Sequence, residues 1–87
     1  MSTPVVLITG AAGGLGRALA QRFFQSHWRV AAADLDSNGL HELNGEVALD
    51  SSVTADLSSA EGCRTLISKV MARTGRLDAL ILSLIHI

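Results

Sequence analysis

The residues with the clearest chemical potential form one glycine-rich segment, Thr9-Gly10-Ala11-Ala12-Gly13-Gly14-Leu15-Gly16. It lies between the continuous apolar run 5–8, typical of a buried strand, and a helix-type apolar pattern that begins at Leu15. Glycine allows a tight turn and a close approach of the backbone to a ligand, while a helix N-terminus offers free amides and a positive dipole end. The segment therefore predicts a site for a phosphate-containing anion, formed by Thr9, Gly10, Ala12, Gly13, Gly14, Leu15 and Gly16.

The residues around this segment narrow the choice of anion. A Walker phosphate loop needs Gly-Lys followed by Ser or Thr, but Gly16 is followed by Arg17 and Ala18, which excludes a nucleoside triphosphatase. Asp34 comes twenty residues after Gly14, at the end of the next predicted strand, where a carboxylate can accept hydrogen bonds from the ribose hydroxyls of adenosine. A dinucleotide is therefore expected. The alternative for Asp34 is a solvated strand end without a ligand.

Charge at the predicted ribose position favours one cofactor. A carboxylate at Asp34 repels a 2′-phosphate, and no basic residue directly precedes Gly14 or follows Asp34. We therefore expect NAD as the cofactor, with NADP less favoured, and Leu35 as a further cofactor-binding residue.

The elements that must position these residues alternate between strand and helix. Strands are predicted at 5–8, 29–33, within 47–55 and at 77–82, and helices at 15–26, 37–43 and 58–74. Such alternation gives a parallel sheet with right-handed crossovers. A chain of this length buries only about 60–65% of its unfolded surface, so the sheet should be incomplete. The predicted fold is α/β, a Rossmann-type doubly wound parallel sheet with about four strands in the order 3-2-1-4.

Two of the predicted helices carry more specific expectations. The first should turn five residues at helical spacing toward the sheet, namely Leu15, Ala18, Leu19, Arg22 through its aliphatic stem, and Phe23. In the last, Ser58 and Glu61 match a capping box, in which each side chain satisfies an orphan amide at the helix start. The same helix should bury its apolar residues, which are Cys63, Leu66, Ile67, Val70 and Met71.

Composition excludes several other functions. Seven basic against eight acidic residues give a net charge of −1 and a pI near 6.2, so no nucleic-acid partner is expected. The apolar stretch 79–87 is shorter than the roughly 18 residues of a membrane span, and no basic stretch precedes the apolar run 5–8. We therefore expect no membrane partner and a cytoplasmic location. His27 and His41 lack partners at metal-binding spacing, so no metal is expected.

The glycine-rich segment resembles that of a known family. Thr9-Gly10-x-x-x-Gly14-x-Gly16 is the form found in classical short-chain dehydrogenases/reductases, and the resemblance extends over about residues 3–81. It implies that Asp56 and Leu57, which follow the third strand, contact the adenine of the cofactor; the alternative for Asp56 is a helix-start residue. It also implies that Asp78, on the fourth strand, helps to hold the sheet rather than take part in hydride transfer.

The resemblance stops near residue 81. The family continues with an Asn-Asn-Ala-Gly-like segment, where this chain has Leu82-Ser83-Leu84-Ile85, and its Tyr-x-x-x-Lys pair lies farther along. The chain contains no tyrosine, and its one lysine, Lys69, lies on a predicted helix surface. Residues 82–87 match the translation of CTG TCT CTT ATA CAC ATC, a transposon end used in sequencing libraries. We therefore expect 1–81 to be the N-terminal half of a Rossmann NAD-binding domain and 82–87 to be a non-native tail.

The resemblance implies an NAD(P)-dependent oxidoreductase that transfers hydride to or from an alcohol or carbonyl group of a small molecule, present here only as its dinucleotide-binding N-terminal part. The 87-residue chain alone is expected to be inactive, and the complete enzyme to be a homo-oligomer. Two alternatives stay open. One is a non-catalytic NAD-binding module, which needs no tyrosine. The other is a truncated fragment without function, whose fourth strand would leave an apolar edge exposed.

Overall fold

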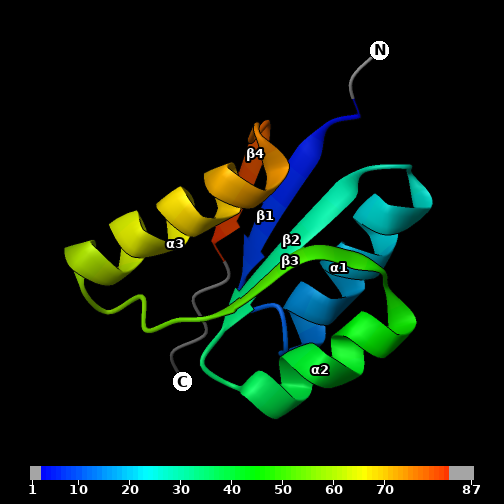
Figure 1. Cartoon of the computed structure of the whole chain (residues 1–87). Helices are drawn as coiled ribbons and strands as arrows, with labels where there is room; N and C mark the ends of the chain where they lie inside the picture. The colour runs from blue at the N-terminus through cyan, green and yellow to red at the C-terminus, as the bar shows by residue number, and fades with distance from the viewer. Residues whose placement is uncertain (1–2, 83–87) are drawn as a thin grey trace.

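Strands and helices alternate along the chain as the sequence predicts. The computed structural model describes residues 3–82, which form β1 (Val5–Thr9), α1 (Gly14–Gln25), β2 (Arg29–Asp34), α2 (Ser37–Glu46), β3 (Leu49–Thr54), α3 (Ala60–Thr74) and β4 (Ala79–Leu82). The strands pair in parallel in the order β3-β2-β1-β4 (Figure 1). The α/β class, the Rossmann-type topology and the strand order 3-2-1-4 are therefore confirmed.

Helices cover both faces of the sheet. In Figure 1, α1 and α2 lie on one side of the strands and α3 lies on the other. The side facing α1 and α2 has a core that includes Val6, Ile8, Ala20, Val30, Ala32, Leu40 and Leu43. The side facing α3 has a smaller core, made of Leu7, Ala31, Ala33, Leu66 and Val70. The central strands β1 and β2 are apolar on both faces because each face is buried under a helix.

Helix α1 faces the sheet through a different stripe from the one predicted. Of the five residues expected to point inward, Leu19 and Phe23 pack against the core. The other three are exposed, namely Leu15, Ala18 and Arg22. Gly16 and Ala20 take the buried positions instead. The reason is steric, because Gly16 lies directly against the backbone of the preceding turn, which directs Leu15 outward and leaves it 59% exposed.

Helix α3 begins one residue later than the predicted capping box. Its N-cap is Ser59, whose Oγ accepts a hydrogen bond from the Gly62 amide at 3.0 Å. Ser58 belongs to the preceding turn, where its amide donates to Asp56 at 2.9 Å. The capping box of Ser58 and Glu61 was therefore wrong, although Glu61 does lie in the first turn, where its charge suits the helix dipole.

Helix α3 also buries fewer residues than predicted. Its inward stripe has a spacing of four and consists of Leu66, Val70 and Thr74, with Ile67 partly buried beside it. Met71 is exposed because it is rotated by about 100° from Val70, and Cys63 is exposed in the first turn. The helix ends, as predicted, at Gly75, which has a φ of 77°. At 15 residues α3 is the longest helix of residues 3–82, and none there is long and apolar enough to cross a membrane.

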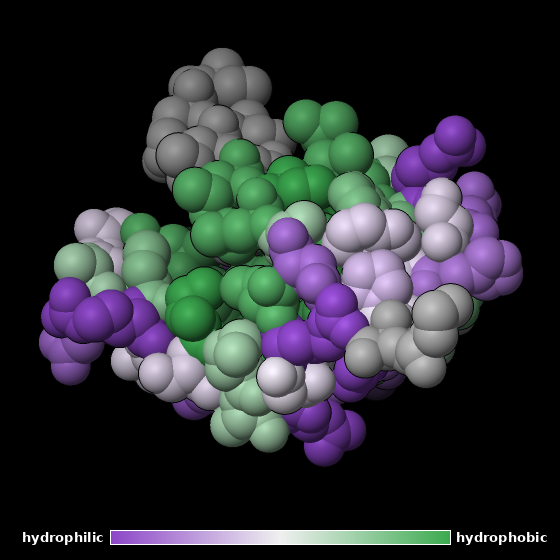
Figure 2. Space-filling view, turned by 90° about the horizontal axis from the view of Figure 1, so that it is seen from above, coloured by the Kyte–Doolittle hydropathy of each residue, from purple (hydrophilic) through white to green (hydrophobic). Residues whose placement is uncertain are grey.

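The two edges of the sheet differ in chemistry. Along β3 the pairing with β2 shifts by one residue, which leaves Asp50 as an extra residue between two pairs. Arg29 forms an ion pair with the Asp50 carboxylate, and Arg73 Nε donates to the Asp50 carbonyl at 3.0 Å. β4 has only apolar side chains, with Leu80 47% and Leu82 59% exposed, and no described strand pairs with its outer side. Seen from above, Figure 2 shows apolar surface gathered in one broad patch, with hydrophilic surface around much of the rest.

The predicted boundary at residue 81 falls inside β4. Leu82 is the last residue of that strand and lies opposite Thr9 of β1. Residues 83–87, which make up the rest of the predicted tail, lie outside the described residues. The division into a domain at 1–81 and a non-native tail at 82–87 therefore stays a prediction.

Candidate dinucleotide-binding site

The glycine-rich segment forms the turn between β1 and α1. Gly10 has a left-handed conformation with a φ of 66°, and its carbonyl accepts the Gly13 amide at 3.1 Å. Gly13 is the N-cap of α1 and offers no side-chain acceptor. Within residues 3–82, the amides of Gly14, Leu15 and Gly16 meet no acceptor. The start of α1 therefore presents free donors together with its positive dipole end, as an anion site requires.

The glycines of this turn differ in what a side chain would meet. A Cβ on Gly16 would lie 2.2 Å from the Gly10 carbonyl oxygen and 2.8 Å from the Ala11 Cα, so α1 can pack against the turn only without a side chain here. A Cβ on Gly14 would meet no atom within 4 Å. Gly14 thus borders open space beside the free amides, and this arrangement fits the pyrophosphate of a dinucleotide.

Asp34 lies at the end of β2, next to the same turn. Its Oδ2 accepts the Ala12 amide at 2.9 Å, and its Oδ1 accepts the Asp36 amide at 3.0 Å. Two backbone amides therefore fix the carboxylate, while each oxygen keeps a further lone pair for a ligand hydroxyl. Leu35, the other predicted residue here, is 68% exposed. Asp36 was absent from the predicted site because it contributes a backbone amide, which has no sequence signature.

Asp56 and Leu57 lie in the loop between β3 and α3. The Ser58 hydroxyl and amide both donate to the Asp56 carboxylate, and these hydrogen bonds lower the pKa of that carboxyl. The Asp56 carbonyl lies against Gly62, where a Cβ would come within 2.0 Å of its oxygen. Leu57 packs against the core under α3. Asp56 thus lies in the loop three residues before Ser59, the N-cap of α3, and contact of either Asp56 or Leu57 with adenine stays a prediction.

Asp78 joins β4 to β1. Its amide donates to the Val5 carbonyl at 2.9 Å, and its Oδ2 accepts the Val5 amide at 2.8 Å. Arg76 donates to both carboxylate oxygens, at 2.8 and 2.6 Å. The hydrogen bonds from Arg76, followed by the one from Val5, lower the pKa of the Asp78 carboxyl. These contacts confirm the expected part of Asp78 in holding the sheet.

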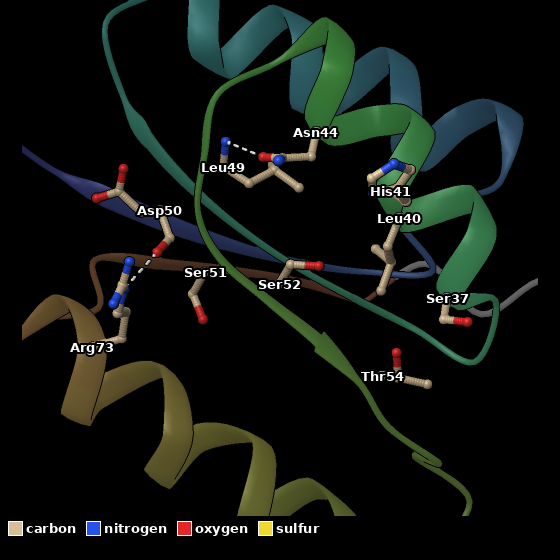
Figure 3. Close-up of a pocket in the computed structure, with 10 residues that line it drawn as sticks. All are labelled: Ser37, Leu40, His41, Asn44, Leu49, Asp50, Ser51, Ser52, Thr54 and Arg73. Carbon is tan, nitrogen blue, oxygen red and sulfur yellow. Dashed lines mark hydrogen bonds between the residues drawn. The ribbon is translucent and has the colours of Figure 1, made fainter.

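A cavity of about 540 Å³ lies alongside β3 (Figure 3). Its lining is mostly polar and consists of Ser37, Leu40, His41, Asn44, Leu49, Asp50, Ser51, Ser52, Thr54 and Arg73. Figure 3 shows Asn44 accepting the Leu49 amide from the α2 side and Arg73 donating to Asp50 from the α3 side. None of the residues predicted to bind the cofactor lines this cavity. No local sequence pattern indicates this cavity, because its walls come from three separate elements, α2, β3 and α3.

Comparison with known proteins identifies the family. A sequence model of the family described as short chain dehydrogenase matches residues 4–83. The chain belongs to the short-chain dehydrogenase family. Cis-2,3-dihydrobiphenyl-2,3-diol dehydrogenase from Pseudomonas putida is 41% identical to it over 80 residues, a match that covers 88% of this chain and 28% of that protein. The chain thus spans less than a third of that relative's length.

Solved structures of short-chain dehydrogenases share the fold. The 3-ketoacyl-(acyl-carrier-protein) reductase from Brucella melitensis, complexed with NADH, has a TM-score of 0.82 and 31% identity, over 88% of this chain and 32% of that one. A metagenomic short-chain oxidoreductase in complex with NADP has a TM-score of 0.82 and 28% identity, over 92% of this chain and 38% of that one. Either cofactor therefore occurs among these neighbours, and family membership alone does not choose between NAD and NADP.

Proposed function

We propose that this chain is the cofactor-binding part of an NAD-dependent oxidoreductase that acts on an alcohol or carbonyl group of a small molecule. The observation that carries the proposal is the placement of free amides at the start of α1 beside the fixed carboxylate of Asp34. The amides of residues 14–16 would hold the pyrophosphate, and Asp34 would accept the hydroxyls of the adenosine ribose. The dinucleotide supplies the hydride chemistry when bound, and the chain's own residues orient it.

The same carboxylate favours NAD over NADP. A 2′-phosphate beside Asp34 would meet a like charge that two backbone amides hold in place. The residues that follow, at 35–37, are Leu, Asp and Ser, so they bring no compensating cation. Arg17, the first basic residue of α1, forms an ion pair with Glu46 of α2 at 3.5 Å. These charges support NAD as the preferred cofactor.

Substitution of Asp34 tests this proposal. Asp34→Ala should weaken NAD binding by at least about tenfold, because a hydrogen bond to a charged group contributes about 1.5–3 kcal/mol and tenfold corresponds to about 1.4 kcal/mol. It should weaken NADP binding far less. Titration calorimetry gives the dissociation constant of each cofactor. Glu42→Ala removes an exposed carboxylate from α2 and should change neither constant, so it is the matched control. Equal losses for NAD and NADP would contradict the ribose role.

A non-catalytic NAD-binding module is the second candidate. The 87 residues contain no tyrosine, but the family's Tyr-x-x-x-Lys pair lies farther along than the stretch that this chain matches, so that absence favours neither candidate. Both candidates use the same cofactor site, so cofactor binding does not separate them. Transposon-free sequencing past the codon for Leu82 does: a downstream Tyr-x-x-x-Lys supports the oxidoreductase, and a stop codon after Ile87 supports the module or a fragment without function.

A further inference from the structure

The Asp34 carboxylate is part of a closed ring of contacts formed by four residues, Ala12, Asp34, Asp36 and Gly39. The Ala12 amide donates to Asp34 Oδ2 at 2.9 Å, and the Asp36 amide donates to Asp34 Oδ1 at 3.0 Å. Asp36 is also the N-cap of α2, where its Oδ1 accepts the Gly39 amide at 2.9 Å. Gly39 closes the ring because it is buried directly against Ala12.

The contact between Gly39 and Ala12 leaves no room for a side chain. A Cβ on Gly39 would lie 2.6 Å from the Ala12 Cβ and 2.7 Å from Asp36 Oδ2. The Asp36 oxygen is the end of a side chain that can rotate, but the Ala12 methyl group is fixed to the backbone of the turn. Helix propensity does not account for glycine at this position, since glycine is among the least favourable residues inside a helix.

We propose that Gly39 is a positioning residue for the cofactor. By letting the first turn of α2 seat against Ala12, it holds the Asp34 carboxylate in the orientation that accepts the ribose hydroxyls. The two amides that fix the carboxylate come from opposite sides of this contact. The Ala12 amide belongs to the turn before α1, and the Asp36 amide belongs to the turn before α2. Any widening of the contact separates the two amides, so it loosens the carboxylate. The inference rests on the proposed NAD site.

Gly39→Ala tests the proposal, with Gly45→Ala as a matched control in the same helix. The variant should raise the dissociation constant for NAD about fivefold to tenfold, since tenfold corresponds to about 1.4 kcal/mol and a single hydrogen bond to a charged group contributes at least that much. A Cβ on Gly45 would meet no atom within 4 Å. Gly45→Ala should therefore leave the constant unchanged. Urea unfolding of every variant establishes that it is folded before NAD is titrated.

Two combined variants separate positioning from a general loss of structure. In an Asp34→Ala background, Gly39→Ala should change NAD binding by less than about twofold, because the carboxylate through which it acts is gone. Ala12→Gly removes the methyl group that the new Cβ would meet. The pair Ala12→Gly and Gly39→Ala should therefore recover most of the affinity that Gly39→Ala alone loses, and should fold even where Gly39→Ala alone does not.

The outcomes distinguish this inference from the proposed function. A wild-type chain that binds no NAD overturns both. If Asp34→Ala weakens NAD binding but Gly39→Ala does not, only the proposed role of Gly39 is overturned. The same holds if the losses of NAD affinity from the two substitutions simply add in the double variant. Failure of Ala12→Gly to restore binding or folding to Gly39→Ala overturns that role too. The role of Gly39 is supported if the losses of NAD affinity from Asp34→Ala and Gly39→Ala do not add and if Ala12→Gly restores the affinity of Gly39→Ala.

Discussion

Gly14 and Gly16 lie two residues apart in one turn, yet alanine at these positions should have opposite effects on stability. At Gly16 the new Cβ would come 2.2 Å from the Gly10 carbonyl oxygen. Overpacking costs about 1–3 kcal/mol, and a clash with backbone belongs at the upper end; the better helix propensity of alanine offsets about 1 kcal/mol, so the net loss is about 2 kcal/mol. At Gly14 the Cβ meets no atom within 4 Å, so only the propensity effect remains. Gly14→Ala should be more stable by up to about 1 kcal/mol.

Urea unfolding followed by the fluorescence of Trp28 measures both changes. Trp28 is the only tryptophan of the chain, and its ring lies edge-on to that of Phe23 in α1, with 5.0 Å between the centroids. With a slope near 1 kcal/mol/M, typical of the smallest domains, the midpoints of the two variants should differ by about 2–3 M. Gly14→Ala should nevertheless bind NAD more weakly than the wild type, because its methyl group enters the space proposed for the pyrophosphate.

The stability prediction and the binding prediction for these two variants can be refuted separately. Equal urea midpoints for Gly14→Ala and Gly16→Ala would refute the steric argument at Gly16. A Gly14→Ala chain that binds NAD as tightly as the wild type would contradict the proposed place of the pyrophosphate, whatever its stability.

Three further substitutions test contacts that hold the fold. Ser59→Ala should lower the free energy of unfolding by about 1 kcal/mol, the usual effect of losing an N-cap. Ser58→Ala should lower it less. If urea unfolding shows the larger loss for Ser58→Ala, the predicted capping box of Ser58 and Glu61 is correct after all. Asp78→Asn should lower the urea midpoint at neutral pH, because the carboxylate that accepts from Val5 and Arg76 is lost. Since those hydrogen bonds lower the folded pKa of Asp78 below 3.8, their contribution is complete above that pH and is lost as the pH falls through the folded pKa. The gap between wild type and Asp78→Asn should therefore narrow below pH 3.8, and a gap that does not change with pH would contradict the argument.

Local sequence patterns predict most of the fold. The strands β1 and β2 were predicted to within one residue of their ends, because each is a continuous apolar run followed by a turn. The bounds of β3 were not predictable, since Asp50-Ser51-Ser52 suits a turn as well as an edge strand, and pairing with β2 decides between them. The inward face of α1 also could not be predicted, because Gly16 meets the turn through backbone atoms, and side-chain periodicity does not record such contacts.

The candidate site divides in the same way. The glycine turn and the neighbouring Asp34 were predictable as a candidate site, because a dinucleotide site requires particular residue types at a particular spacing. The groups that hold the Asp34 carboxylate were not predictable, since Ala12 and Asp36 act through their backbone amides. By helix propensity alone, a glycine at position 39 would only weaken α2. Only the folded chain shows that it lies against Ala12.

The unlike edges of the sheet have a consequence for synthesis on the ribosome. Apolar collapse of a chain this size takes at most about 100 μs. A strand able to pair in parallel with β4 must follow a crossover of a dozen or more residues, and translation at about 5–20 residues per second needs about 1–3 s to supply it. During that interval the exposed Leu80 and Leu82 can mispair with a neighbouring nascent chain, whereas the interrupted edge of β3 resists such pairing.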